Sequence, residues 1–194
     1  MPTVAFFAMA ALLLVAAPCL PCSVVGPLPS AQELVNRAEV IVRARVEGLS
    51  DEPGRGGTLA GSPSQVRFTV LVVLKGSLRH SVLEFNGHLD DRDDPNDRVV
   101  PYDFVRPGGR HGNCFALGYR QGAEYLLLLT RADHQAYAQA NQLTPYWSPL
   151  RPTNEQLFGV ADPWERWVVQ QIAAGEAAIA DRHPRSKSRK RKAG

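Results

Sequence analysis

Apolar and polar residues alternate along several short stretches of the chain, as they do in half-buried β-strands. The first predicted strand covers residues 39–47, which are rich in valine and isoleucine. A second covers residues 66–74, and its later half is apolar at every position, so we expect it to be buried on both faces. A third, residues 82–85, follows a turn at residues 75–77.

The most apolar predicted strand covers residues 124–130, where Tyr125 is followed by four consecutive leucines. This pattern is typical of a central strand that is buried on both faces. Residues 114–116 are predicted as its neighbour before the intervening turn. Residues 49–64 are rich in glycine, proline, serine and acidic side chains, so we expect an irregular connection there.

Two helices are predicted from their starting signals. Ser30 and Glu33 have the spacing of a capping box, which predicts a short helix through about Asn36. Asp162 is followed by Pro163, a combination that favours the first turn of a helix. The side chains expected to pack this second helix against the strands recur at helical spacing: Trp164, Trp167, Val168, Gln171 and Ile172.

The N-terminus carries an apolar run from Val4 to Ala17 that ends in small residues. Such a run matches the apolar core of an export signal and is shorter than the ~20 residues of a membrane-spanning helix. At this length a cleaved signal peptide and an uncleaved N-terminal anchor both stay open, and the absence of lysine or arginine before Arg37 is untypical of an export signal. We therefore expect residues 1–21 to be one of these. The protein would be secreted, periplasmic or held in the cell envelope.

The positive charge is concentrated at the C-terminus. The formal net charge is +3, and seven of the 22 basic residues lie in residues 181–194, so the rest of the chain is mildly acidic. This tail has no apolar anchor and is predicted to be disordered, with weak contact to acidic lipid or wall polymer as one use. Specific nucleic-acid binding is not expected, because no aromatic residues alternate with the charges. Residues 22–180 are expected to form one domain.

Whether the protein is exported decides the expected chemistry of its three cysteines, Cys19, Cys22 and Cys114. An oxidising compartment favours disulfides, and loss of Cys19 with the signal would leave Cys22 and Cys114 to pair. That bond would close a loop of about 90 residues, which chain-entropy models credit with roughly 4–5 kcal/mol. If Cys19 is retained, one thiol is unpaired, and a Cys19–Cys22 redox or metal pair is an alternative.

A series of motifs in fixed order supports a family resemblance. They are Cys22, the stretches 38–46 and 68–76, Cys114, Gly118, Gly122 and the stretch 125–128. Together they resemble the netrin-like domain of the tissue inhibitors of metalloproteinases and its bacterial relatives, over residues 22–130. The resemblance implies a mainly β fold, a five-stranded OB-type Greek-key barrel with flanking N- and C-terminal helices. The stretches 101–109 and 152–156, followed by 162–164, look like those of an uncharacterised bacterial group.

The resemblance also implies a mechanism. In the inhibitors, an N-terminal cysteine places its α-amino group and carbonyl on the protease zinc and displaces the catalytic water. Here that would require Cys22 to be the first residue of the mature chain, with Pro21 just before the cleaved bond. We expect a non-catalytic binding or interaction module whose partner is an unknown protein or cell-envelope ligand. Metalloprotease inhibition through Cys22 is an alternative.

An acidic loop at residues 90–97 is a candidate cation site, because closely spaced carboxylates are what calcium requires. The candidate ligands are Asp91, Asp93, Asp94 and Asp97. The loop lacks the glycine and terminal glutamate of an EF-hand, so a solvated surface loop is the other interpretation. A calcium-stabilised structural protein is therefore a further alternative. His88 and His111 flank the loop and would suit a transition metal only with additional carboxylates.

Exposed aromatic and arginine side chains in glycine- and proline-rich stretches are typical of binding faces. The candidates are Tyr102, Phe104, Arg106, Trp147 and Arg151, and the alternative is that they seal a small core. The chain is not expected to be an enzyme and no cofactor other than calcium is predicted. His111 and Cys114 could pair as base and thiol, but no Gly-x-Ser-x-Gly, phosphate-loop or His-Glu-x-x-His motif occurs.

Overall fold

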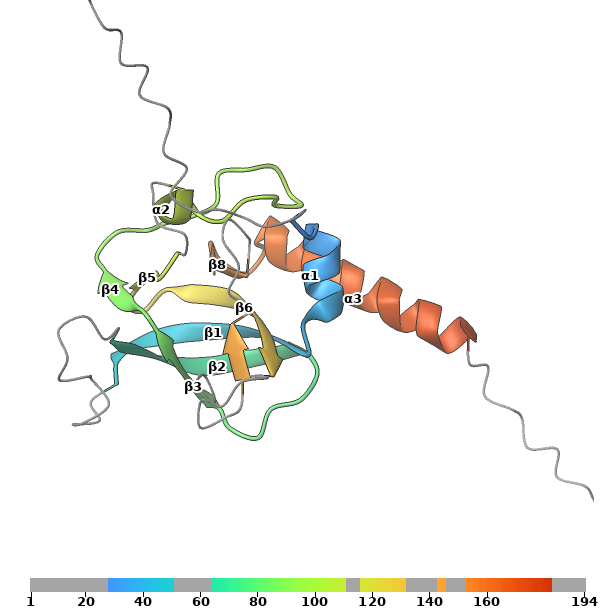
Figure 1. The fold of residues 1–194 in the computed structure, drawn as a ribbon, viewed down its shortest axis with the longest axis horizontal. Helices are drawn as coiled ribbons and strands as arrows, with labels where there is room; N and C mark the ends of the chain where they lie inside the picture. Colours follow the sequence, from blue (N-terminus) through green and yellow to red (C-terminus); the bar gives the residue numbers. More distant parts are fainter. Residues whose placement is uncertain (1–27, 51–63, 111–115, 132–142, 146–152, 183–194) are drawn as a thin grey trace, which may run out of the picture.

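The computed structural model describes residues 28–50, 64–110, 116–131, 143–145 and 153–182 (Figure 1). Several predictions fall outside these ranges. They are the leader at residues 1–21, the pairing of Cys22 with Cys114, the roles of Cys19 and His111, the binding residues Trp147 and Arg151, and the basic tail beyond Arg182.

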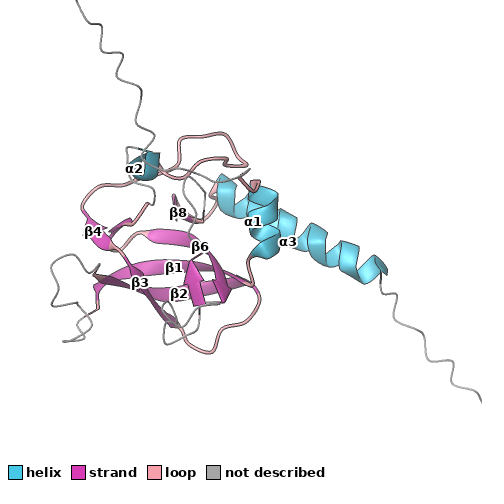
Figure 2. Cartoon of the chain, viewed as in Figure 1, coloured by secondary structure: helices cyan, strands magenta, loops and turns pink. Residues whose placement is uncertain are grey.

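Strands form the body of the domain and the two longer helices lie together at one side of it (Figure 2). The elements, in chain order, are α1 (Ala31–Arg37), β1 (Val40–Leu49), β2 (Gln65–Lys75), β3 (Val82–Asn86), β4 (His88–Asp90), α2 (Pro107–Arg110), β5 (Gly118–Arg120), β6 (Glu124–Arg131), β7 (Leu143–Pro145), β8 (Asn154–Leu157) and α3 (Pro163–Arg182). The predicted mainly β class is confirmed.

Six strands form an antiparallel sheet in the order β3-β2-β1-β6-β7, and β8 also pairs with β6. The two remaining strands, β4 and β5, form a small parallel pair. The pairing orders of both sheets are open, so neither sheet closes on itself among the described residues. β1 and β6 lie at the centre, as the run of leucines in β6 predicted.

The sheet separates two apolar cores. The first core lies on one face, where alternate residues of β1 and β6 pack with β2, β3 and Tyr119 around Phe68. The second core lies on the other face, where Ile41, Leu126 and Leu128 pack beneath α1 and α3 together with Trp164. Because consecutive side chains of a strand point to opposite faces, strands that serve both cores must be apolar throughout. The sequence of β6 meets that requirement.

Helix α1 begins with the predicted capping box. Ser30 Oγ accepts a hydrogen bond from the Glu33 amide, and Glu33 Oε2 accepts one from the Ser30 amide at 2.7 Å. Its buried face carries Leu34 and Val35 onto the second core. At its far end, Lys75 Nζ donates to the Val35 carbonyl oxygen at 2.7 Å, which joins the helix to the end of β2.

The later half of β2 is not buried on both faces, so that prediction was wrong. Leu71, Val72 and Val73 are 38%, 46% and 41% exposed. β3 pairs with β2 only as far as Thr69, and two bulges interrupt the β1–β2 register beside this segment. A bulge displaces side chains from regular alternation, and these three apolar residues belong to neither core. The turn that follows needs Gly76, whose φ is +76° and whose added Cβ would lie 2.2 Å from the Glu39 carbonyl oxygen.

The strand expected at residues 114–116 is also displaced. β5 begins at Gly118, and Ala116, the one described residue of that range, lies outside any strand. The Ala116 carbonyl oxygen accepts hydrogen bonds from the side chains of Arg106 and Asn154. Two side chains therefore bind this carbonyl oxygen, which would be paired with a neighbouring strand if residue 116 belonged to a sheet.

Helix α3 starts at the predicted cap, Asp162. Its carboxylate accepts hydrogen bonds from the amides of Trp164 at 2.8 Å, Glu165 at 3.3 Å and Phe158 at 3.0 Å, and the residue is 5% exposed. Among the described residues, no helix is both long and apolar enough to cross a membrane.

Replacing Asp162 by alanine should lower the free energy of unfolding by about 1–2 kcal/mol, because three amides lose their acceptor. Urea denaturation followed by tryptophan fluorescence measures the change. The matched control is Asp181→Ala near the exposed end of the same helix, which should change stability by less than about 0.5 kcal/mol. Equal effects of the two substitutions would contradict the assignment of Asp162 as the cap.

Candidate functional site

Strand β8 is polar in sequence and yet fully buried. Thr153 and the first three residues of the strand, Asn154, Glu155 and Gln156, are at most 5% exposed. The strand pairs with β6, placing Asn154 beside Leu127 and Gln156 beside Tyr125. Buried polar groups are unfavourable unless they form hydrogen bonds, so the partners of β8 identify what covers it.

The amides of Asn154 and Gln156 bind the chain around β5 and the long connection after β4. Asn154 Nδ2 donates to the Tyr119 hydroxyl at 2.5 Å. Gln156 Oε1 accepts from the Asp94 amide at 2.8 Å, and Gln156 Nε2 donates to Asp93 Oδ1 at 2.5 Å. We call residues 91–106 the anchored segment, because Gln156 of β8 binds the Asp94 amide and the Asp93 carboxylate.

Arg106, at the end of the anchored segment, is completely buried. Its Nη1 donates to the Gly118 carbonyl oxygen at 3.0 Å and its Nη2 to the Ala116 carbonyl oxygen at 2.5 Å. The guanidinium lies 5.3 Å from the ring centroid of Tyr119 and 5.0 Å from that of Tyr125, within the range of cation–π attraction. Both rings belong to the first core, so a single side chain ties the segment to the centre of the domain.

Glu155 is the second buried ionisable residue of this cluster. Burial raises the pKa of Glu155 to about 8, although the charge of Arg106 and a hydrogen bond from Asn96 favour the ionised form. The carboxyl group is therefore mostly protonated at neutral pH. Its Oε2 atom has no hydrogen-bond partner among the described residues. We call Arg106, Asn154, Glu155 and Gln156, with Asp93 and Asp94, the polar anchor.

The structure places two predicted binding residues in the interior. Tyr102 is 7% exposed and stacks on Trp164 with ring centroids 4.9 Å apart, and Arg106 is 0% exposed. Neither therefore contributes to an exposed face, because each fills a place in a core. Phe104 is half-buried beneath the guanidinium of Arg98, which lies 5.1 Å from its ring centroid.

The four candidate calcium ligands point to different partners. Asp93 pairs with Arg120, and Asp97 pairs with Arg110 at 2.5 Å. Hydrogen bonds from these arginines lower the pKa of both carboxyls. Asp94 accepts from the Gly108 amide at 2.9 Å, while the side chain of Asp91 is 96% exposed. Among the described residues, no three histidine, cysteine or acidic side chains are grouped to hold a metal ion.

Comparisons with known proteins gave no match for this chain. No family model, no curated protein and no solved structure matches it. The interpretation of the site therefore depends on its own geometry.

Sequence reasoning missed the polar anchor, although a signal was present. The stretches 101–109 and 152–156 were set apart as signatures without a function, and the structure brings them together. Arg106 comes from the first, and Asn154, Glu155 and Gln156 come from the second.

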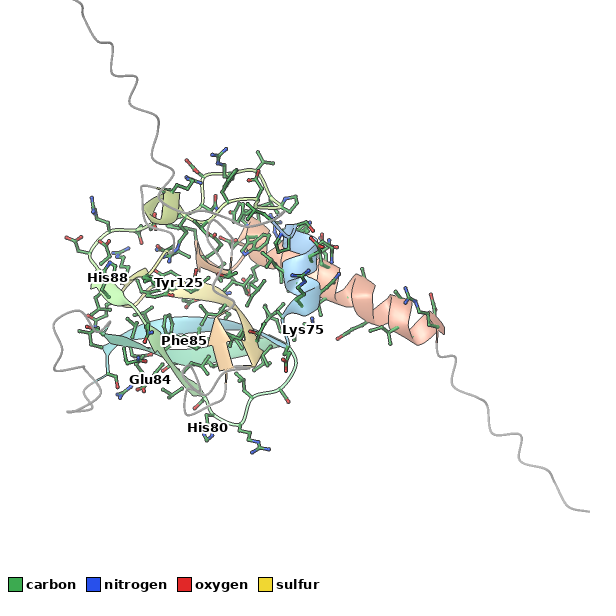
Figure 3. All side chains as sticks on the ribbon, viewed as in Figure 1. Lys75, His80, Glu84, Phe85, His88 and Tyr125 are labelled. Carbon is green, nitrogen blue, oxygen red and sulfur yellow. The ribbon has the colours of Figure 1, made fainter. Side chains whose placement is uncertain are left out.

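The polar anchor is a positioning device, because the anchored segment covers it. Its outer side presents Asp91, Arg92, Asp97 and Val99, all exposed, with Val99 at 87%. Beside it, Leu89, Asp90, Asp91, Arg120 and Gln121 line an open hollow of about 380 Å³. The segment lies at the end of the domain opposite the β2–β3 loop that carries His80 (Figure 3). We call this outer side the presented face.

Proposed function

We propose that this chain is an exported, non-catalytic binding module that recognises a protein or cell-envelope ligand through the presented face. The observation that carries the proposal is the burial of Arg106 and Glu155 beneath an otherwise exposed connection. Burying ionisable groups is unfavourable unless their partners are in place, so this arrangement stabilises only one conformation of the segment.

A fixed conformation favours binding. Ordering a loop costs about 1–2 kcal/mol per residue, and a loop already ordered in the free protein avoids that cost when it binds. The presented face combines charges of both signs with an exposed valine, which suits a protein surface better than a nucleic acid or an apolar ligand. Arg106 and Glu155 of the polar anchor are buried, which argues against a catalytic role for these two groups.

We further propose an OB-type barrel related to the netrin-like domain. What supports it is the path of the strands around the first core. β1 pairs with both β2 and β6, β3 continues into β4 through Gly87, and β4 pairs with β5, which turns into β6. Side chains from these strands pack together with Phe68 and Tyr119, as the interior of such a barrel requires. Export is supported by the apolar N-terminal run alone.

Site-specific crosslinking tests the presented face. A photo-reactive amino acid replaces Val99 in the full chain expressed in its native host, and adducts are identified by mass. We expect an adduct of defined mass from position 99. The matched control replaces His80, which is also exposed but lies at the opposite end of the domain (Figure 3). No adduct at position 99, or the same adducts at both positions, would contradict the proposal.

A further inference from the structure

The second half of helix α3 extends beyond the rest of the domain (Figure 1). Trp164 and Val168 in the first half are fully buried, whereas every residue from Ala173 to Arg182 is exposed. We call residues 173–182 the overhang. At 1.5 Å per residue, the overhang is about 15 Å long. The packed first half of the helix therefore holds a projecting second half.

The sequence explains why the overhang is helical although all of its residues are exposed. Five of its ten residues are alanine, which has the highest helix propensity. The buried first half supplies the costly nucleus, so each further residue adds a hydrogen bond to an existing helix. Arg182 in the last turn interacts favourably with the negative end of the helix dipole. The overhang is therefore an arm of defined length.

The overhang leads into a strongly basic sequence. Residues 182–192, which we call the basic segment, hold seven lysines and arginines and no acidic residue. The chain before residue 181 has 15 basic and 18 acidic residues and is mildly acidic. The positive charge of the protein is thus concentrated at the end of the overhang and beyond it, while the rest of the chain carries the opposite net charge.

The length of the overhang suits contact with an anionic surface. Such a surface attracts the basic segment and repels the mildly acidic domain. Both forces decay over the Debye length, which is about 8 Å at physiological ionic strength. An arm of about 15 Å keeps the domain outside the range of the repulsion while the basic segment touches the surface.

We propose that α3 is an arm that attaches the domain, through the basic segment, to a bilayer that contains anionic lipid. Clusters of about four to eight lysines and arginines bind such bilayers. A nucleic acid is a poorer partner, because the segment has no aromatic side chains on which bases stack. The attachment does not involve the presented face, so it can succeed or fail independently of the proposed function.

A second observation favours a bilayer over a soluble polyanion. The apolar run from Val4 to Ala17 directs the chain to a membrane, either as an export signal or as an anchor. Helix α1, which follows that run, packs beside α3 at one side of the domain (Figure 2). The apolar run and the basic segment therefore both join the domain at its helical side, where an apolar and a basic signal would act together on one bilayer.

Vesicle titration of the purified full chain tests the lipid contact. An environment-sensitive fluorescent amino acid at position 188 reports on the basic segment itself, whether or not the N-terminal run also enters the vesicles. The signal should change with vesicles of phosphatidylcholine and phosphatidylglycerol in equal parts, but not with phosphatidylcholine alone. Salt should reverse the change, because exposed charges are screened.

Two triple variants locate the charges that matter. Replacing Lys190, Arg191 and Lys192 by glutamine should raise the lipid concentration at half-maximal signal about 100-fold, since each basic side chain near an anionic surface contributes roughly fivefold. The matched control replaces three exposed arginines of the domain by glutamine and removes the same net charge. We expect less than about a threefold change from it. These three arginines are Arg37, Arg79 and Arg166.

A deletion tests the role of the overhang. Removing residues 173–179 shortens the arm by about 10 Å, or about two helical turns, and brings the domain within the Debye length of the surface. The half-maximal lipid concentration should rise at least about threefold. All the removed residues are exposed, so circular dichroism should show a folded domain. Ile179→Ala keeps the length of the arm and should bind like the wild type.

Several results would overturn the proposal. The same signal with neutral and anionic vesicles, or equal effects of the two triple variants, would mean that the basic segment does not bind anionic lipid. Tighter binding to soluble polyphosphate than to the anionic vesicles would assign the segment to a polymer instead. An unchanged affinity of the deletion variant, or an Ile179→Ala variant as weak as the deletion, would show that the overhang is not a spacer.

Discussion

Replacing Arg106 by methionine should lower the free energy of unfolding by about 3–5 kcal/mol, one of the two largest effects expected of a single substitution here. Methionine has nearly the same length but cannot donate to the carbonyl oxygens of Ala116 and Gly118. The Gly118 carbonyl oxygen would lose this donor, the Ala116 carbonyl oxygen would keep only the longer bond from Asn154, and the attraction of the cation to the rings of Tyr119 and Tyr125 would be lost. Urea denaturation at pH 7 measures the change.

Arg98→Met is the matched control for that experiment. Arg98 also lies over an aromatic ring, that of Phe104, but it is exposed on the anchored segment. We expect a loss of at most about 1 kcal/mol. If Arg98→Met and Arg106→Met were equally destabilising, Arg106 would not be the residue that anchors the segment.

Replacing Glu155 by glutamine should change the pH dependence of stability. The folded-state pKa of Glu155, about 8, lies far above that of an unfolded glutamate, about 4.3. Between these values the folded protein holds a proton that the unfolded chain has released. The stability from this group is therefore fully present below about pH 4 and decreases as the pH rises towards 8. The slope approaches about 1.4 kcal/mol per pH unit for one proton.

Glu155→Gln keeps the shape of the protonated acid and cannot ionise. We expect the variant to lack this slope and to be more stable than the wild type above about pH 6. Thermal denaturation from pH 4.5 to 8.5 measures both curves. Glu47→Gln, at an exposed position of β1, should leave the wild-type slope in place. A wild-type curve that rises from pH 5 to 8, or parallel curves for wild type and Glu155→Gln, would mean that Glu155 is ionised in the folded state.

Local signals predicted most of the regular elements. The capping box at Ser30 and the cap at Asp162 both lie where the sequence indicated, because each motif satisfies amides within a few residues of itself. The four leucines of β6 predicted a central strand for a similar reason: a strand covered on both faces must be apolar at every position.

Long-range arrangement accounts for what the sequence did not predict. The later half of β2 is as apolar as β6, but the bulges beside it and the end of pairing with β3 leave Val72 exposed. β8 is polar, and its burial depends on hydrogen bonds with a segment about 60 residues earlier in the chain. Arg106 was a candidate for an exposed binding face because it lies in a glycine- and proline-rich stretch, and only its contacts with β5 and the tyrosines explain its burial.

The proposed binding face requires one physical property, which is that the polar anchor holds residues 91–106 in a single conformation. Backbone ¹⁵N relaxation of the free protein measures it directly. We predict order parameters of about 0.85 along the segment, as in rigid backbone, and a clear decrease there in Arg106→Met. Order parameters below about 0.6 in the wild type would contradict this proposal, because a mobile segment would present no fixed face to a partner.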